Sequence, residues 1–129
     1  MKKKLYTYPV FVFFVFFVFG CANQLPPSGG EDDLIPPKVL KMSPESNTLN
    51  FKDNIVSIEF NEYVERRSLK DALFVSPKPI GELNFNWSGT KVEIEFPKGL
   101  LKNTTYSFVI GKGLKDIHGN TLTAPIEFS

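Results

Sequence analysis

The amino-acid sequence predicts an all-β fold, an antiparallel β-sandwich of about seven short strands with one short helical turn. Three observations predict it. Several segments alternate apolar and polar side chains with a period of two. Pro, Gly and Asn residues separate these segments at short intervals. No stretch shows the regular succession of strands and helices that builds a parallel sheet.

Three segments show the clearest alternation, and two of them predict a hairpin. Residues 54–60, 82–88 and 91–96 place apolar side chains on one face and polar ones on the other, which is typical of half-buried strands. Gly89 and Thr90 fit a two-residue type II′ loop. That loop pairs Ser88 with Lys91, Trp87 with Val92, Phe85 with Ile94 and Leu83 with Phe96.

Weaker strands are expected at residues 39–43, 48–51, 105–110 and 125–129. Residues 105–110 are partly apolar on both faces, which predicts a central strand. The one helical turn is expected at residues 68–74, where Ser68 and Asp71 form an imperfect capping box.

The first twenty residues predict an export signal rather than part of the fold. Three lysines precede residues 10–19, which are all Val or Phe, and Gly20 follows. This is the layout of a secretory signal with its small-residue cleavage site. Ten apolar residues are too few for a membrane-spanning helix, which needs about 20. The alternative, a buried core strand, would create a strong aggregation site at the N-terminus.

Cys21, the only cysteine of the chain, follows the signal directly. The sequence Val18-Phe19-Gly20-Cys21 resembles the lipobox of bacterial lipoproteins. The resemblance implies that the mature chain begins with a lipidated Cys21 that binds the bilayer. Ala22 stands where inner-membrane lipoproteins of enteric bacteria carry Asp, so outer-membrane sorting at the cell envelope is expected.

The predicted organisation is therefore a signal peptide at 1–20, a lipidated Cys and Pro/Gly-rich tether at 21–37, and a folded domain at 38–129. Removing the signal takes away three lysines and no acidic residue, which changes the net charge from +1 to −2. Neither form has the basic excess of a nucleic-acid-binding protein.

Two motifs resemble those of known families. Residues 100–106, which end in Tyr106, resemble the strand entry of immunoglobulin-like and fibronectin-like domains, where a Tyr hydroxyl bonds to upstream backbone. Residues 113–120 resemble a turn of bacterial Ig-like domains of the S-layer (SbsA) type. Those domains share three further features with this chain: Pro36-Pro37, Ser43-Pro44 and Ile58-Glu-Phe-Asn-Glu62.

The whole layout resembles a lipoprotein group of Bacteroidetes-type bacteria. The resemblance implies an Ig-like sandwich with a structural, adhesion-like or scaffold role and no catalytic residue. In that group the domain is usually the N-terminal module of a longer lipoprotein, so this chain is expected to be the module alone, from a short gene or a truncated one.

The sequence offers little catalytic chemistry. His118 is the only histidine, so neither a His/Cys zinc site nor a Ser-His-Asp triad is supported. Asp116, Asn120 and the Ile117 carbonyl could offer oxygen atoms to calcium, but the calcium-loop pattern is absent. We expect Asp116 to cap its own turn, with Gly119 at positive φ and Asn120 tolerating the same region.

No catalytic, metal or cofactor site is therefore predicted. The carboxylates of Glu59, Glu62 and Glu65 are interpreted as solvated charge rather than a glycosidase pair.

These inferences predict a non-enzymatic, membrane-anchored lipoprotein that presents an Ig-like structural or interaction module at the cell envelope. Its partners are expected to be the bilayer, through Cys21, and an envelope protein or glycan. The alternative is an adhesion module that binds a glycan or protein ligand. Trp87 is in phase with the core, which argues against a glycan site.

Overall fold

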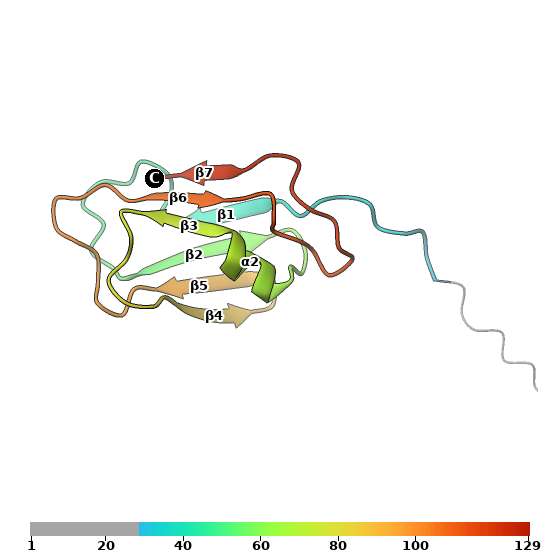
Figure 1. The fold of residues 1–129 in the computed structure, drawn as a ribbon, viewed down its shortest axis with the longest axis horizontal. Coiled ribbons are helices and arrows are strands. Elements are labelled where there is room, and N and C mark those ends of the chain that lie inside the picture. Colours follow the sequence, from blue (N-terminus) through green and yellow to red (C-terminus); the bar gives the residue numbers. More distant parts are fainter. Residues whose placement is uncertain (1–28) are drawn as a thin grey trace, which may run out of the picture. The chain divides into compact units, whose positions relative to one another are not determined.

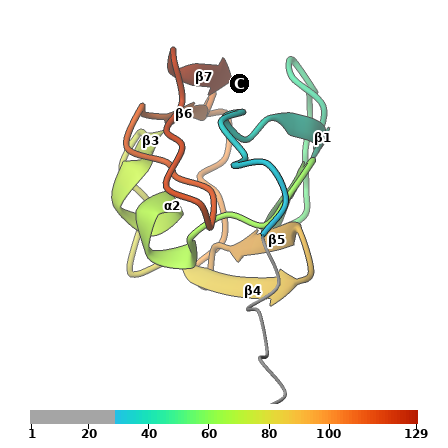
Figure 2. The same ribbon diagram turned by 90° about the vertical axis from the view of Figure 1, so that its right-hand side faces the viewer.

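The computed structural model describes residues 29–129, of which Asp33–Ser129 form one compact unit. The predicted signal peptide and Cys21 lie outside the described residues. Within the compact unit, two antiparallel sheets face each other and enclose the core (Figures 1 and 2).

The strand order is that of the constant-type immunoglobulin sandwich. The four-stranded sheet has the order β1 (Val39–Ser43), β2 (Ile55–Phe60), β5 (Lys91–Glu95) and β4 (Asn84–Ser88). The three-stranded sheet has the order β3 (Leu73–Ser76), β6 (Ser107–Ile110) and β7 (Ile126–Phe128). One helix, α2 (Arg66–Ala72), precedes β3. The predicted class, an Ig-like β-sandwich with one short helix, is confirmed, and β6 is central as expected.

The predicted hairpin register is confirmed between β4 and β5. Ser88 pairs with Lys91, Trp87 with Val92, and Phe85 with Ile94. Gly89 has a φ of 61° whereas Thr90 has no positive φ, as a type II′ loop requires. The strand begins at Asn84, so the expected pair of Leu83 and Phe96 lies outside the ladder.

The sequence-based prediction was wrong for two neighbouring elements. Residues 48–51 form no strand, and Leu49 is exposed to 84% in the loop between β1 and β2. The helix begins at Arg66 rather than Ser68, and residues 73–76 form β3. Pairing of Leu73 with Ile110 on β6 explains this, because a ladder with a central strand overrides a local helical pattern.

Aromatic rings fill the space between the sheets. Phe96 is exposed to only 1% and meets the rings of Tyr106 and Phe108 edge-on, each at a centroid distance of 6.0 Å. Phe108 stacks on Phe128 at 4.9 Å. These contacts link the end of β5 to both β6 and β7, so the aromatic cluster joins the two sheets.

Tyr106 also fixes the chain before β6. Its hydroxyl accepts a hydrogen bond from the Leu101 N–H at 3.2 Å, five residues upstream. The ring is buried while the intervening residues 101–105 are exposed. The hydroxyl therefore closes the loop that leads into the central strand of the smaller sheet.

Replacing Tyr106 with Phe should lower the free energy of unfolding by about 1 kcal/mol, because the Leu101 N–H loses its partner. Urea unfolding followed by the fluorescence of Trp87, the only tryptophan, measures this directly. Tyr63→Phe is the matched control, because Tyr63 is exposed to 58% and should lose almost nothing. Equal losses in the two variants would contradict the assignment.

Candidate functional site

Three segments that are distant in sequence meet at one end of the sandwich. Val64 forms an isolated β-bridge with Asp116, and the Glu65 N–H donates to the Lys115 carbonyl at 2.8 Å. The segment before β1 joins them, because the Lys38 N–H donates to the Asn61 side chain at 2.6 Å. This end therefore brings together residues 33–38, 61–65 and 115–120.

Ser68 ties the helix to the same end. Its buried hydroxyl accepts from the Lys115 N–H at 2.9 Å and donates to the Glu65 carbonyl at 2.8 Å. The expectation that Ser68 caps the helix was wrong, since the helix begins two residues earlier without a side-chain cap. The hydroxyl instead bridges α2 to the strand-like segment that leads to Asp116.

The carboxylate of Asp116 lies at the centre of this end and is exposed to only 2%. One oxygen accepts the N–H groups of His118 and Asn120, each at 2.8 Å. The other accepts the Asn120 side-chain amide at 2.7 Å. Gly119 completes the turn with a φ of 93°, a conformation that side-chain-bearing residues rarely adopt. The turn from Asp116 to Asn120 thus has a defined geometry around one buried charge.

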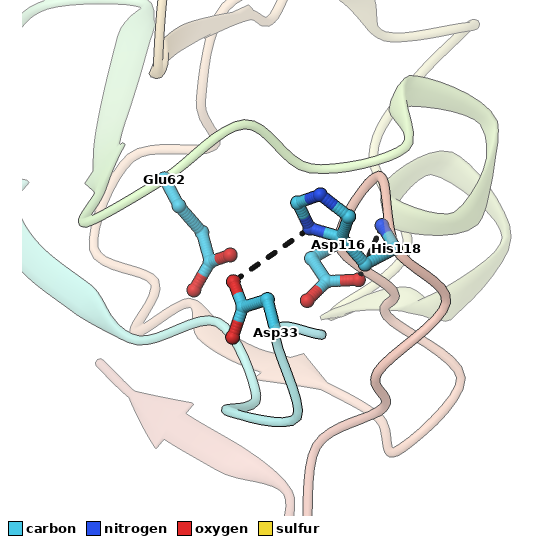
Figure 3. A group of neighbouring side chains, drawn as sticks. All are labelled: Asp33, Glu62, Asp116 and His118. Atoms are coloured by element: carbon cyan, nitrogen blue, oxygen red, sulfur yellow. Dashed lines mark hydrogen bonds and ion pairs between the residues drawn. The ribbon is translucent and has the colours of Figure 1, made fainter. Parts of the chain in front are cut away.

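The same turn holds the segment in front of β1. The Asn120 amide also donates to the Asp33 carbonyl at 2.9 Å, and His118 Nδ1 lies 3.6 Å from an oxygen of the Asp33 side chain. Figure 3 shows Asp33, Glu62, Asp116 and His118 pointing toward one another, with ligand-type atoms all within 4.8 Å. Residues 33–37, assigned to the tether from the sequence, thus contact the folded domain.

The cluster has the atoms of a cation site but is already organised by internal hydrogen bonds. Three carboxylates and an imidazole could surround a cation. Both Asp116 oxygens are however occupied by donors of their own turn. Asp33 and His118 have side chains exposed to 36% and 53%, so they face water as well as each other. The cluster of Asp33, Glu62, Asp116 and His118 mainly connects the three segments 33–38, 61–65 and 115–120, and we call it the clasp.

Hydrogen bonding also sets the charge of the clasp. Burial alone raises the pKa of Asp116, but the Asn120 side chain and the backbone N–H groups of Asn120, His118 and Gly119 stabilise the ionised form. The net effect lowers the pKa below the usual aspartate value. Asp116 is therefore ionised in the folded domain at neutral pH.

The other residues singled out from the sequence lie elsewhere. Trp87 faces the sandwich interior, half-buried, with the Arg66 guanidinium 5.6 Å from the centre of its ring. Tyr106 belongs to the core, and Cys21 lies outside the described residues. Sequence reasoning missed the involvement of Asp33, Glu62 and Ser68 at this end, because residues 115–118, which they meet there, are distant in the chain.

Comparison with known families decides the classification. A family model described as a bacterial Ig-like domain matches residues 33–129. The chain belongs to this family. The match begins at Asp33, whose carbonyl accepts from the Asn120 amide and whose side chain lies near His118. Among curated proteins and solved structures, none matches the chain.

Bacterial Ig-like domains of this family are generally non-enzymatic structural modules of surface and extracellular bacterial proteins. Across residues 29–129, no helix has the length and apolar character that crossing a membrane requires.

Asp116→Ala should destabilise this Ig-like domain by about 2–4 kcal/mol, because three donors of the turn lose a buried charged acceptor. Urea unfolding followed by Trp87 fluorescence provides the measurement. Asp71→Ala is the matched control: Asp71 is exposed and pairs only loosely with Arg67 at 3.9 Å. Its loss should stay below about 1 kcal/mol. An Asp116→Ala loss no larger than that of the control would contradict the clasp.

Acid should remove the contribution of Asp116. Because its pKa is lowered by folding, the carboxylate stabilises the domain above the ordinary aspartate range, and this contribution is lost as the pH falls through the folded-state pKa. The stability gap between the natural chain and Asp116→Asn should be largest near neutral pH and should shrink below about pH 4. A gap that is constant from neutral to acidic pH would contradict this.

Proposed function

We propose that the protein is a lipid-anchored component of the bacterial cell envelope that presents its Ig-like domain as a non-enzymatic interaction module. The observation that carries the proposal is the order of features along the chain. A signal-like segment, a lipobox-like sequence ending in Cys21, and a short polar segment precede the family domain at residues 33–129. Each feature is ordinary by itself, but this order is typical of bacterial lipoproteins.

Lipidation would explain why the chain contains a single, unpaired cysteine. The chain offers Cys21 no partner for a disulfide, and an unpaired cysteine in an exported protein needs an explanation. Each acyl CH₂ buried in a bilayer contributes about 0.8 kcal/mol, so two or more chains hold a protein stably. Because Ala22 follows Cys21, we place the anchor in the outer membrane.

The distance between the anchor and the domain suits a presented module. Eleven residues separate Cys21 from Asp33, and they can extend over roughly 40 Å. They are rich in Pro, Gly and acidic residues, which disfavours a packed structure. The domain can therefore reach a partner beyond the lipid headgroups.

We infer that the partner is a protein rather than a glycan. The outer face of the four-stranded sheet is polar and carries exposed Asn84, Asn86 and Ser88 on its last strand. Trp87, the residue best suited to stack on a sugar, points into the sandwich with Arg66 over its ring. The edge strands of the two sheets carry backbone N–H and C=O groups without a strand partner, and such edges can bind an extended polypeptide segment.

Cys21→Ser should move the protein from the membrane fraction to the soluble fraction and abolish incorporation of labelled fatty acid. Cell fractionation with immunoblotting measures the first effect, and labelling of the purified protein measures the second. The matched control is the double variant Cys21→Ser with Ser28→Cys, which restores a thiol outside the lipobox and should stay unlabelled. Fatty-acid labelling that persists in Cys21→Ser would sink the proposal.

A further inference from the structure

Exposed apolar side chains surround the clasp at one end of the domain. Each of its three carboxylate residues is followed directly by an apolar residue, and all of these are more than half exposed. Together with their exposed neighbour Ile35 we call them the apolar rim: Leu34, Ile35, Tyr63 and Ile117. Because the charged atoms of the clasp lie within 4.8 Å of one another, the rim residues gather around one centre. Figure 2 views this end of the sandwich face on.

Backbone hydrogen bonds hold the rim in place. The Ile117 N–H donates to the Tyr63 carbonyl at 3.3 Å, so these two residues are neighbours. The Ile35 N–H donates to the Asp33 side chain at 2.9 Å, and the Asp33 carbonyl accepts from the Asn120 amide. The rim is therefore built on hydrogen-bonded backbone from all three segments that meet at the clasp.

The chain from the proposed lipid anchor enters the domain at this rim. Asp33 is the first residue of the compact unit and also a member of the clasp. Eleven residues separate it from Cys21, and they span at most roughly 40 Å. An anchored Cys21 therefore keeps this end near the bilayer, which raises the effective concentration of the rim at the lipid surface.

The opposite end of the sandwich lies farther along the chain path from the anchor. Exposed apolar side chains such as Leu49 and Leu101 occur there as well. The loops that carry them, between β1 and β2 and between β5 and β6, lie at the far ends of the strands (Figure 1). A strand of five residues such as β1 adds about 17 Å. The rim is therefore the apolar surface that an anchoring bilayer meets first.

The charge at the rim selects the type of lipid. The segments 33–38, 61–65 and 115–120 together contain four carboxylates and two lysines. Asp33 and Glu62 are only partly buried, so their charges reach the surface inside the rim. Carboxylates repel anionic phospholipid headgroups and attract the ammonium groups of zwitterionic ones.

We propose that this end of the domain is a membrane-contact surface that docks onto a bilayer of zwitterionic phospholipids. The apolar rim enters the boundary between headgroups and acyl chains, where Tyr is favoured and where apolar burial drives binding. The central carboxylates meet ammonium headgroups. The proposal rests on the lipid anchor proposed above, and it orients the domain so that its sheet edges and opposite end stay free for a protein partner.

Brominated lipids and a placed tryptophan test this contact. The chain from Cys21 onward, which retains the whole compact unit, is coupled through the Cys21 thiol to a maleimide lipid in phosphatidylcholine vesicles. This coupling replaces lipidation in cells, so a failure here is separate from a failure of the anchor. Either Tyr63→Trp at the rim or Leu49→Trp at the opposite end adds a reporter. Trp87 stays in both variants, and the coupled natural chain gives its background.

Bromine on the acyl chains quenches a tryptophan that touches them, whereas one that is merely held near the surface stays in water. The added fluorescence of Tyr63→Trp should be quenched several-fold more strongly than that of Leu49→Trp. Both positions are exposed, so a general affinity of tryptophan for lipid would quench the two variants alike. Equal quenching, or none in Tyr63→Trp, overturns the proposal.

Two further changes separate rim contact from nearness to the anchor. In the Tyr63→Trp chain, Ile117→Ser should lower the quenching, and the matched control Leu101→Ser, at the opposite end, should leave it unchanged. Replacing half of the phosphatidylcholine with anionic phosphatidylglycerol should also lower it at low salt. Quenching that ignores Ile117→Ser, or that grows on the anionic vesicles, would contradict a zwitterionic contact made by the rim.

Discussion

The buried carboxylate of Asp116 is the interaction on which one whole end of the domain depends. Its oxygens order the turn from His118 to Asn120, and that turn in turn holds Asp33 through the Asn120 amide. The neighbouring Lys115 backbone binds both Glu65 and Ser68, which fixes the start of α2. A buried charge is tolerated only when its hydrogen bonds are complete, as they are here. The turn that Asp116 organises therefore helps to hold residues 33–38 on the fold, together with the bond from the Lys38 N–H to Asn61.

Aromatic packing holds the rest of the sandwich together, and its edge strands differ in length, charge and regularity. The aromatic contacts from Phe96 to Tyr106 and Phe108 join the two sheets. Among the edge strands, β1 has an irregular register and a charged residue and β7 has only three residues, whereas β3 and β4 are both uncharged. Domains of this family are generally non-enzymatic structural modules.

Whether an element could be predicted from the sequence depends on how far apart in the chain its interacting residues are. The β4–β5 hairpin could be predicted because a local turn at Gly89 and the side-chain alternation specify the same register. β3 could not, because residues 73–74 fit a helical pattern and become a strand only through pairing with β6. Likewise Asp116 could be identified as a turn residue, but its link to Asp33 depends on contacts between distant parts of the chain. Structure that depends on neighbouring residues could be predicted from the sequence, whereas structure that depends on contacts between distant residues could not.

The central functional claim is that the domain is presented on a lipid anchor at Cys21. The intact mass of the protein purified from membranes tests this claim most directly, together with sequencing of its first peptide. The account predicts a chain that has lost residues 1–20 and begins at Cys21 with added acyl mass. A membrane-derived chain that retains residues 1–20, or that begins at Cys21 without added acyl mass, would contradict it.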